Sequence, residues 1–464
     1  MPQTLWNRGF IALLITQFTV AFNDNVFRWL LIPIGKAYMP GGEDNIRLLG
    51  AVFLIVPFLL LASIAGFVTD RFSRRKTVIW CKAIELALLA IAVGVICLGP
   101  PISDANTGVP IKVVLLLGLL FLLGSQSAFF APSKYALIPT LVPNTSISSA
   151  NGIMVMLTML AVVLGQIVGG VVFMLTTLHE NRIPTDIPGG HNVWITILVL
   201  VGTGTIGLLA SFFIPKMKAV DPKAKFPKNP FLQTGKDLAT LFSHKALFCA
   251  AIASSFFWGL AALAQNNIDK YATEYLMVQQ GYVTPLIAIL TIGIGIGAML
   301  CGYLSGKRIE LGLVPIGAFF MGLFILILGF TPGYAEAVER GFGNPLATPY
   351  IFGAVIMLLA GLGAGLYDVP LAAYIQKNSP EAQRGRMVAA YNFCAFSAVL
   401  LFAGLGWLGA IIFNPLGGGM SSLMIWIMTG LITLAVCAVL LYLYNAEFKA
   451  FLSRFFKRGK EEQQ

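Results

Sequence analysis

Long apolar runs are the feature that most constrains how this chain can fold. Windows of about 20 apolar residues, the length that a helix needs to cross a bilayer, recur along the whole sequence. They cover twelve stretches, at roughly 10–34, 48–69, 77–99, 111–131, 148–177, 192–214, 246–272, 283–305, 313–331, 349–374, 388–412 and 420–445. A backbone inside lipid must satisfy its own hydrogen bonds, so each run predicts a helix. We therefore predict an all-α membrane protein with twelve transmembrane helices.

The overall composition agrees with this prediction. Hydrophobic residues make up 57% of the chain, charged residues only 11%, and the mean hydropathy is +0.83. Soluble domains carry about 25% charged residues, so a soluble globular protein is excluded. The first apolar run follows only Arg8 and lacks a small-residue cleavage site, so we expect it to remain as the first helix and not to be a signal peptide.

Lys and Arg are unevenly divided between the loops on the two sides of these spans. Of the 31 basic residues, 23 lie on the side of the termini, five in the opposite loops and three inside spans. The five are Lys36, Arg47, Lys112, Arg182 and Arg340. Lys134 is counted among the 23 because it follows the span 111–131. By the positive-inside rule, both termini are expected in the cytoplasm, and the net charge of +11 needs no nucleic-acid partner.

One polar segment divides the chain almost in half. Residues 216–245 form the longest interruption between apolar runs and are rich in Lys and Pro. The sequence therefore predicts an N-terminal six-helix half at 1–215, a cytoplasmic linker at 216–245, a C-terminal six-helix half at 246–445 and a basic cytoplasmic tail at 446–464.

An internal repeat supports two pseudo-symmetric halves. The stretch from Gln265 to Lys270 aligns with that from Asn23 to Arg28 at an offset of 242. Three further pairs follow in order, Gly66 with Gly302, Pro132 with Pro370 and Asn151 with Asn392, at offsets of 236, 238 and 241. Such repeats build many transporter folds, although coincidence among residues that are common in membrane helices is the alternative.

Polar side chains inside the first and seventh runs are the first candidate site. The first run carries Asn23, Asp24, Asn25 and Arg28, and the seventh carries Asn266, Asn267, Asp269 and Lys270. A charge at membrane depth costs about 3 kcal/mol on insertion scales, so such groups normally face a protein interior or a wet cavity and mark function. The alternative is that the amides and Asp24 only join helices by hydrogen bonds. Arg28 follows Asp24 by one turn, so the two can share a face.

A second charged pair lies in the third run. Lys82 and Glu85 are three residues apart, which places them about one turn apart on a helix. One interpretation is that the pair faces the cavity and contributes to substrate binding. The other is that Lys82 reaches toward the nearby membrane interface, as long basic side chains do.

Catalytic and metal-binding patterns find little support. The six cysteines form no CxxC or metal-type spacing. His179, His191 and His244 all fall in predicted loops, and no nucleotide-binding Gly-rich lysine loop is present. We expect no catalytic residue, no metal, no cofactor and no enzyme activity, and we argue against an ATP-driven pump.

The segment between the second and third runs carries a family resemblance. Gly66, Asp70, Arg71, Arg74 and Arg75 stand in the sequence GFVTDRFSRR. It resembles the cytoplasmic signature of the major facilitator superfamily, G-x-L-A-D-R-x-G-R-[RK], with Ser in place of the second Gly. The resemblance implies the major facilitator fold and a gating role for these residues. On physical grounds, Asp70 can bind a helix N-terminus or an Arg across the interface between the halves. The equivalent position in the second half is Gly306, so the contact there is expected to be weaker.

Further passages resemble bacterial lysophospholipid transporters. QFTVAFNDN at 17–25 is similar to their opening Q-F-x-x-A-F-x-D-N, and FFAPSKY at 129–135 with ANG at 150–152 is similar to a segment between their fourth and fifth spans. LYDVPLAAYIQ at 366–376, RGR at 384–386 and AAYN at 389–392 extend the resemblance into the second half. Asp368 and Tyr391 depart from the pattern.

The resemblance implies a flippase that moves lysophospholipid from the outer to the inner leaflet of the bacterial inner membrane by alternating access. The expected partners are the lysophospholipid, membrane lipids and a cytoplasmic acyltransferase that reacylates the lipid, and the carrier is expected to be a monomer. Phosphate suits Arg28 or Lys270, and an ethanolamine ammonium suits Asp24.

Two alternatives stay open. The first is an ion-coupled carrier of a small polar or drug-like solute, in which Asp24 or Glu85 takes up a proton. The second is a membrane sensor or scaffold whose tail, from Lys449 to Lys460, binds a partner. A lipid carrier requires a polar pocket that continues into an apolar, laterally open groove, whereas a solute carrier requires a closed polar cavity.

Overall fold

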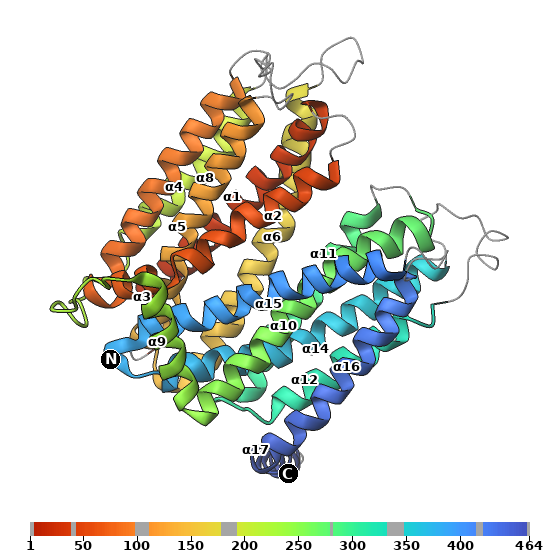
Figure 1. The fold of residues 1–464 in the computed structure, drawn as a ribbon. Helices are drawn as coiled ribbons and strands as arrows, with labels where there is room; N and C mark the ends of the chain where they lie inside the picture. Colours follow the sequence, from red (N-terminus) through yellow and green to blue (C-terminus); the bar gives the residue numbers. More distant parts are fainter. Residues whose placement is uncertain are drawn as a thin grey trace. The chain divides into compact units, whose positions relative to one another are not determined.

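The computed structural model describes residues 4–38, 43–97, 111–177, 193–278, 282–331, 348–413 and 421–461. All regular elements within these ranges are helices or helical turns (Figure 1). Expectations for His179, His191, Arg182 and Arg340 and for the last three residues of the tail lie outside the described residues.

Helices occupy every predicted apolar run. The first half of the chain contains α1 (Arg8–Tyr38), α2 (Glu43–Leu60), α3 (Ala62–Arg71), α4 (Arg74–Cys97), α5 (Ile111–Leu141), α6 (Ile147–Thr177), α7 (Val193–Ile197) and α8 (Thr203–Ser211). A π-helical turn, Leu198–Gly202, joins the last two. After α9 (Pro230–Ser243) come α10 (Lys245–Lys270), α11 (Val283–Ser305), α12 (Leu313–Leu328), α14 (Thr348–Asn378), α15 (Arg384–Phe413), α16 (Ser422–Leu443) and α17 (Asn445–Glu461).

The predicted count of twelve spans is confirmed only in part. Within the described residues, ten helices are long and apolar enough to cross a membrane. An eleventh span is the pair formed by α2 and α3, which bends by 60°. Pro57, which cannot donate to the carbonyl one turn earlier, precedes the bend by one turn. The remaining run is the shorter apolar helix α12.

One predicted boundary is wrong in a way that matters for the site. The fourth run was expected to end at residue 131, with Lys134 in a loop, but α5 continues to Leu141. Pro132 and Pro139 lie inside this helix, and Lys134 is buried at 7% exposure. Proline is a strong helix breaker in water, whereas neighbouring helices in a membrane can satisfy the freed backbone groups. When Lys134 is removed from the count, the loops on the side of the termini still hold most of the basic residues.

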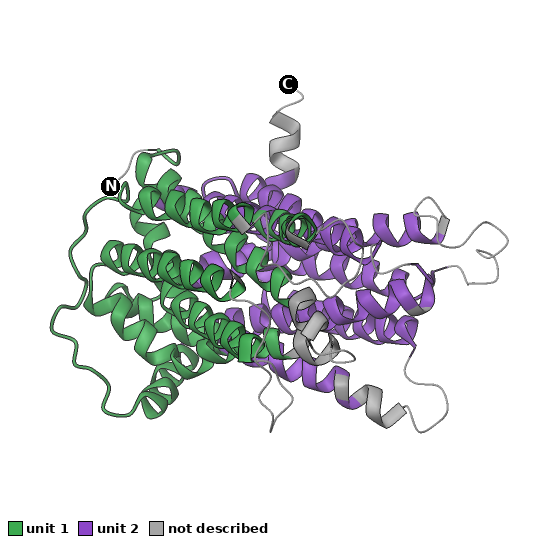
Figure 2. Cartoon of the chain, turned by 90° about the horizontal axis from the view of Figure 1, so that it is seen from above, with its two compact units in different colours: residues 1–142, 161–243, 379–393 green, residues 143–160, 244–378, 394–464 purple. Residues whose placement is uncertain are grey.

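The chain forms two compact units, which Figure 2 colours separately. Unit 1 comprises residues 1–142, 161–243 and 379–393, and unit 2 comprises 143–160, 244–378 and 394–464. Two long helices are therefore divided, because α6 begins in unit 2 and α15 begins in unit 1. The sequence analysis divided the chain into two consecutive halves at the linker, whereas these units are defined by contacts in space. The predicted halves therefore stay a prediction.

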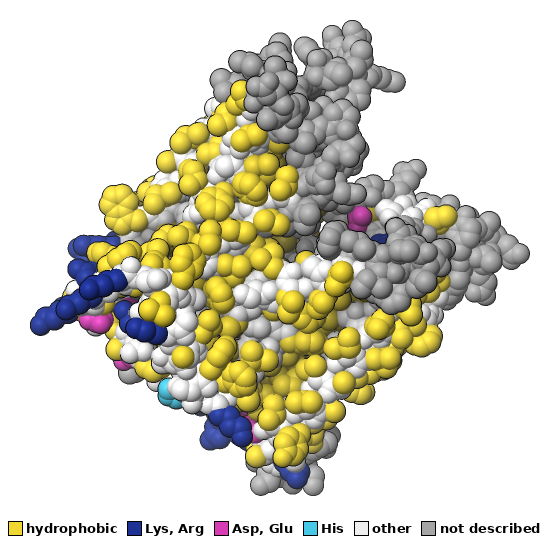
Figure 3. Space-filling model, in the orientation of Figure 1, with side chains coloured by type: hydrophobic (Ala, Val, Ile, Leu, Met, Phe, Trp, Pro, Cys, Tyr) yellow, Lys and Arg dark blue, Asp and Glu magenta, His cyan; other side chains and the backbone are white. Residues whose placement is uncertain are grey.

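The surface of the helices is apolar, as a lipid-facing surface requires. Large exposed side chains include Trp80 at 68%, Leu198 at 63% and Leu401 at 60%. Figure 3 shows hydrophobic side chains spread over the flanks of the helices, with Lys and Arg gathered at the end of unit 1 where α3 and α4 meet.

Small residues allow the helix backbones to approach closely inside each unit. In unit 1, a Cβ on Gly124 of α5 would lie 2.7 Å from the carbonyl oxygen of Leu54 in α2. In unit 2, a Cβ on Gly363 of α14 would lie 2.6 Å from the backbone nitrogen of Met321 in α12. Lipid is as apolar as the side chains, so close packing has to supply the attraction between membrane helices.

We expect Gly363→Ala to destabilise the protein by about 1–3 kcal/mol, because the added methyl would overlap the backbone of α12. The matched control is Gly404→Ala in α15, where no atom lies within 4 Å of the added carbon. Thermal melting in detergent measures both variants. Equal melting temperatures for the two would contradict the close contact.

Candidate functional site

The carboxylate of Asp70 binds the N-terminus of α15. Its Oδ1 accepts a hydrogen bond from the backbone N–H of Gly385 at 2.8 Å, and its Oδ2 accepts one from Arg386 at 3.0 Å. Exposed N–H groups and the helix dipole make a helix N-terminus a natural partner for an anion. We call this contact the Asp70 latch. It joins α3 of the first sequence half to α15 of the second, and all its atoms lie in unit 1.

Two glycines make the Asp70 latch possible. A Cβ on Gly66 would lie 2.8 Å from the Cα of Arg386, and a Cβ on Gly385 would lie 2.6 Å from Oδ1 of Asp70. Any larger residue at either position would separate the two helices. Gly66 is therefore needed for a steric reason, because α15 approaches α3 too closely for a side chain at this position.

The motif arginines donate to backbone carbonyls around the Asp70 latch. Arg74 donates to the carbonyl of Ala136 in α5 at 3.0 Å, and its guanidinium lies 3.9 Å from Asp70. Arg75 donates to Phe212 at the end of α8 at 3.0 Å. Arg71 donates to Ala224 of the linker. The guanidinium groups thus bind the segments that surround the end of α3.

The linker helix α9 lies beside α3 (Figure 1). Ser63 of α3 donates a hydrogen bond to the carbonyl of Pro230 at 2.8 Å. Asp237 on α9 is buried, accepts a hydrogen bond from Gln233 at 2.8 Å and interacts electrostatically with Arg386. Burial raises the pKa of Asp237 above its ordinary value. The sequence analysis did not single out this carboxylate, because an acidic residue in a polar linker carries no pattern of its own.

The equivalent contact in unit 2 is uncharged. Gly306, at the position that matches Asp70, ends α11 with a positive φ of 57°. Nearby, Ser148 and Ser305 share a hydrogen bond of 2.9 Å, and Ser149 donates to the carbonyl of Gly302 at 3.0 Å. The described α6–α11 contact therefore uses hydroxyl groups and glycine, and the expectation that it is weaker than the Asp70 latch stays a prediction.

The consecutive polar side chains of α1 contact different partners. Asn23 is fully buried and donates to Glu85 Oε1 at 3.1 Å, while Asn25 donates to its own helix at the carbonyl of Ala21, at 2.8 Å. Asp24 lies between them and accepts a hydrogen bond from Ser127 of α5 at 3.3 Å. Arg28, one turn further, is half-buried. The structure therefore gives Asn23 a contact that joins α1 to α4, gives Asn25 a hydrogen bond within α1, and leaves Asp24 with a different environment.

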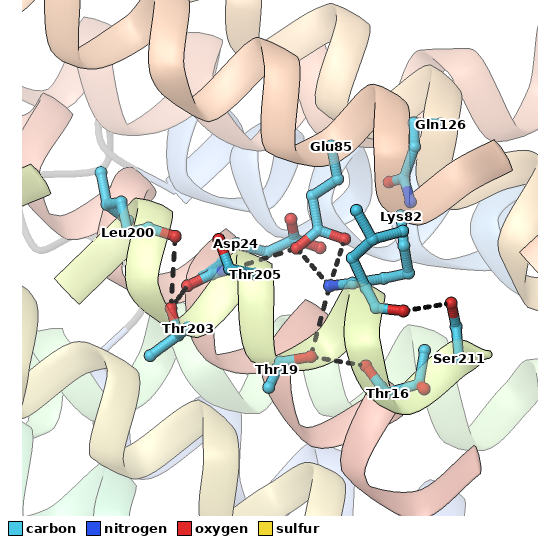
Figure 4. A network of polar contacts seen from close by, with 12 residues as sticks. Thr16, Thr19, Asp24, Lys82, Glu85, Gln126, Leu200, Thr203, Thr205 and Ser211 are labelled. Atoms are coloured by element: carbon cyan, nitrogen blue, oxygen red, sulfur yellow. Dashed lines mark hydrogen bonds and ion pairs between the residues drawn. The ribbon is translucent and has the colours of Figure 1, made fainter. Parts of the chain in front are cut away.

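Lys82 and Glu85 form a closed ion pair inside unit 1 (Figure 4). The ammonium of Lys82 lies 2.7 Å from both carboxylate oxygens of Glu85 and donates to Thr19 at 3.2 Å. Both side chains are 0% exposed. Lys82 does not reach toward the interface, so that interpretation is wrong. A direct contact with substrate would require the surrounding helices to separate, and the substrate-binding role of this pair stays a prediction.

Asp24 and Lys134 are two charged residues of unit 1 that interact electrostatically without forming an ion pair. Oδ1 of Asp24 is buried without a hydrogen-bond partner. The ammonium of Lys134 lies over the ring of Tyr135, 4.3 Å from its centroid, and 5.8 Å from that of Phe130. The two residues interact electrostatically, but within the described residues neither has an oppositely charged group within 4 Å. We call Asp24 and Lys134 the open charge pair.

The second predicted set lies on α10 in unit 2 and also faces several ways. Asn267 is buried and donates to the carbonyl of Ser422 at the start of α16, at 3.0 Å. Asn266 is exposed, and Asp269 and Lys270 are half-buried. Asn267 thus joins α10 to α16 through its nitrogen, and its Oδ1 is buried without a hydrogen-bond partner. The substrate-binding roles of all four residues stay predictions.

Asp368 on α14 is a buried carboxylate in unit 2. It is 7% exposed and accepts a hydrogen bond from Ser254 of α10. In the ranges that the structure covers, no cation lies within ion-pair distance of it. The sequence marked Asp368 only as a departure from a family pattern, and its burial was not predicted.

Two signals in the sequence pointed to side chains that the prediction left out. Lys134 stands inside the quoted segment FFAPSKY, but the assumed helix end at residue 131 placed it in a loop. Ser127 interrupts an apolar run and now proves to bind Asp24. In the described ranges, no three His, Cys, Asp or Glu side chains gather as metal ligands would.

We expect Lys82→Met to destabilise the protein by about 3–5 kcal/mol, because it leaves the carboxylate of Glu85 buried without its cation. Replacing Glu85 by Leu in the same protein should recover most of the loss. Thermal melting in detergent measures both, with the exposed Lys307→Met as control. A wild-type melting temperature for Lys82→Met would show that the pair does not stabilise unit 1.

Comparisons with known proteins identify relatives over nearly the whole chain. The lysophospholipid transporter LplT of Photorhabdus laumondii subsp. laumondii is 25% identical over 407 residues, which cover 87% of this chain and 89% of the relative. LplT of Escherichia fergusonii is 25% identical over 435 residues, 92% and 96% of the two chains. Among solved structures, the transporter FucP in its outward conformation superposes with a TM-score of 0.68 at 11% identity, covering 93% of this chain and 98% of that one.

These relatives and structural neighbours are named as transporters, and the described residues of this chain include ten helices that are long and apolar enough to cross a membrane. The protein is a multi-pass membrane protein, and the major facilitator fold predicted from the sequence is confirmed. The sequence model of the Major Facilitator Superfamily matches residues 13–403, and the chain belongs to that superfamily.

Proposed function

We propose that this protein transports lysophospholipids from the outer to the inner leaflet of a bacterial inner membrane by alternating access. Relatives that carry the name lysophospholipid transporter match about nine-tenths of the chain at about 25% identity, which supports this substrate class. The residue patterns at 17–25, 129–135 and 366–376 resemble the same family.

The observation that carries the proposal is the open charge pair. A buried carboxylate and a buried ammonium normally pair, because an isolated charge in a dry site is costly. Asp24 and Lys134 lie near each other without pairing. A zwitterionic headgroup supplies what both lack, since its ammonium can bind Asp24 and its phosphate can bind Lys134. Charge-assisted hydrogen bonds of this kind are about twice as strong as neutral ones.

The other predicted residues take supporting roles in this proposal. Arg28 is half-buried one turn from Asp24 and provides a second cation for phosphate. Lys82 and Glu85 position α4 beside α1, and their contact with the lipid stays a prediction. In the second half, Asn266, Asp269 and Lys270 are the candidates that would complete the site during the transport cycle.

The Asp70 latch is the candidate gate. By the distribution of Lys and Arg, its side of the membrane is the cytoplasm. A contact that must open in each cycle can be strong only if its groups have other partners when it opens. Water can replace the N–H groups of Gly385 and Arg386 at the carboxylate of Asp70.

We also propose a monomeric carrier that delivers lipid to a cytoplasmic acyltransferase.

A second candidate function is an ion-coupled carrier of a small polar solute. The buried carboxylate of Asp368 favours it, because a carboxylate without a nearby cation can be neutralised by a proton. A lipid transporter can also be coupled to an ion, so evidence for ion coupling would not separate the two candidates. The identity of the substrate separates them.

The substrate test is binding of lysophosphatidylethanolamine to the purified protein, measured as an increase in melting temperature in detergent. Binding to the folded state at 100 times Kd stabilises it by about 2.7 kcal/mol. We expect Asp24→Asn to weaken binding of lysophosphatidylethanolamine more than binding of lysophosphatidylglycerol, which has no ammonium. Lys134→Gln should weaken both, by about 2 kcal/mol if a charge-assisted hydrogen bond is lost.

Matched ligands and one variant control this test. Diacyl phosphatidylethanolamine should stabilise less than the lysolipid, because the second chain adds bulk. Ser453→Ala, which removes an exposed hydroxyl whose hydrogen bond within the described residues is to the carbonyl of Ala450 on its own helix, should bind like wild type. Stabilisation by sugars, amino acids or drugs with both lipids inert would replace the lipid proposal by the solute carrier.

We expect Asp70→Asn to slow transport by about tenfold or more, because losing about 1.4 kcal/mol from the Asp70 latch shifts its equilibrium tenfold. Uptake by reconstituted vesicles measures the rate. Asp221→Asn is the control, since within the described residues its carboxylate accepts from the backbone N–H of Lys223 at 3.2 Å. The substitution keeps the backbone N–H of Asp221, which donates to the carbonyl of Asp70 at 2.9 Å. Wild-type uptake by well-folded Asp70→Asn would remove the gating role.

A further inference from the structure

Unit 1 contains an apolar cavity on its outer flank, separate from the open charge pair. Its volume is about 560 Å³, and residues of α3, α4 and α5 line it. Trp80 is 68% exposed, and Ile84 of α4 and Leu122 of α5 are each 48% exposed, so the cavity opens to the side. We call it the lateral groove.

The wall that α4 contributes is a continuous ridge. Lys76, Trp80, Ile84 and Leu88 all line the lateral groove and follow one another at intervals of four residues. Such residues share one face of a helix. At 1.5 Å per residue, the ridge is about 18 Å long. One leaflet of a bilayer contributes about 15 Å of hydrocarbon, so the ridge spans one leaflet.

The charge at one end of the ridge sets the orientation of the occupant. Lys76 lies at the basic end of unit 1, where α4 begins, and its side chain is exposed. The neighbouring Arg71 and Arg75 donate to backbone carbonyls, whereas Lys76 has no hydrogen bond or ion pair within the described ranges. An ammonium at the headgroup end of an apolar groove is complementary to a phosphate that carries an acyl chain.

The size of the lateral groove favours a chain over a helix. A helix 18 Å long and 10 Å wide would fill about 1,400 Å³, which exceeds the roughly 1,160 Å³ of empty space in the lateral groove even with its open side included. An extended acyl chain is much thinner than a helix. Along the ridge it would contact the apolar side chains of Trp80, Ile84 and Leu88. A lipid of the leaflet at the basic end matches both the length and the charge.

We propose that the lateral groove binds one acyl chain of an anionic glycerophospholipid, with the phosphate at Lys76. The site is built within α3, α4 and α5 and does not depend on which substrate the protein transports. Because α3 carries Asp70, a lipid in this position contacts the same helix end as the Asp70 latch.

Trp80 provides a reporter inside the lateral groove. The protein is reconstituted in phosphatidylcholine vesicles that contain increasing fractions of phosphatidylglycerol brominated in its acyl chains, which quenches nearby tryptophan fluorescence. The signal of Trp80 is the difference between wild type and Trp80→Phe. We expect brominated phosphatidylglycerol to quench this signal at about one-fifth of the mole fraction that brominated phosphatidylcholine requires, the preference that one lysine at an anionic headgroup supplies.

The variant that tests the proposal is Lys76→Gln, with the exposed Lys307→Gln as its matched control. Lys76→Gln should lose the preference for phosphatidylglycerol, and Lys307→Gln should keep it. Native mass spectrometry of purified wild type and Lys76→Gln gives a second readout that does not require Trp80→Phe, with fewer retained phosphatidylglycerol molecules expected for the variant.

Three outcomes would overturn the proposal. Equal quenching by the two brominated lipids would show that the lateral groove holds ordinary boundary lipid. A preference that survives Lys76→Gln would place the phosphate elsewhere. Quenching by a brominated lysophospholipid at a lower fraction than either diacyl lipid would assign the lateral groove to the transported substrate.

Discussion

The high cost of an uncompensated charge in an apolar interior governs the arrangement of this protein. In the described part of unit 1, two pairs of charges inside the helix bundle meet this constraint in opposite ways. Lys82 and Glu85 satisfy each other at 2.7 Å with Thr19 and Asn23 around them, and the result is a closed structural network. Asp24 and Lys134 stay apart, with a hydroxyl and two aromatic rings as their neighbours. A membrane protein retains an unpaired charge where a ligand or a moving part completes it.

The same constraint explains the end of α3. A carboxylate there is stable because it binds the N-terminus of α15, and the guanidinium groups nearby bind the carbonyl of Ala136 within α5 and that of Phe212 directly after α8. Glycine on both sides lets the backbones meet. Unit 2 makes its corresponding contact with Ser148 and Ser305, which are neutral. The internal repeat therefore preserves the packing of the helix ends but not its electrostatics.

Function rests on separate levels of support. Membership of the superfamily follows from the match over residues 13–403 and establishes a membrane transporter fold. The lysophospholipid substrate is our proposal, drawn from the relatives and from the open charge pair. The lateral groove concerns the surrounding lipid and depends on neither. A carrier of lipids in a bilayer has to distinguish the lipid that it moves from the lipids that surround it, and the two sites lie on different faces of α5.

The sequence by itself determined the helices, because apolar runs of membrane length allow no other structure. It also located the Asp70 contact, because a carboxylate beside a glycine at a helix end has few stable partners. Tertiary structure alone decided which polar residues face which neighbour: Asn23, Asp24 and Asn25 are consecutive, and successive residues turn by about 100° around a helix. It also decided that α5 continues through Pro132 and buries Lys134, because the groups that satisfy a proline-interrupted helix come from other helices and leave no local pattern.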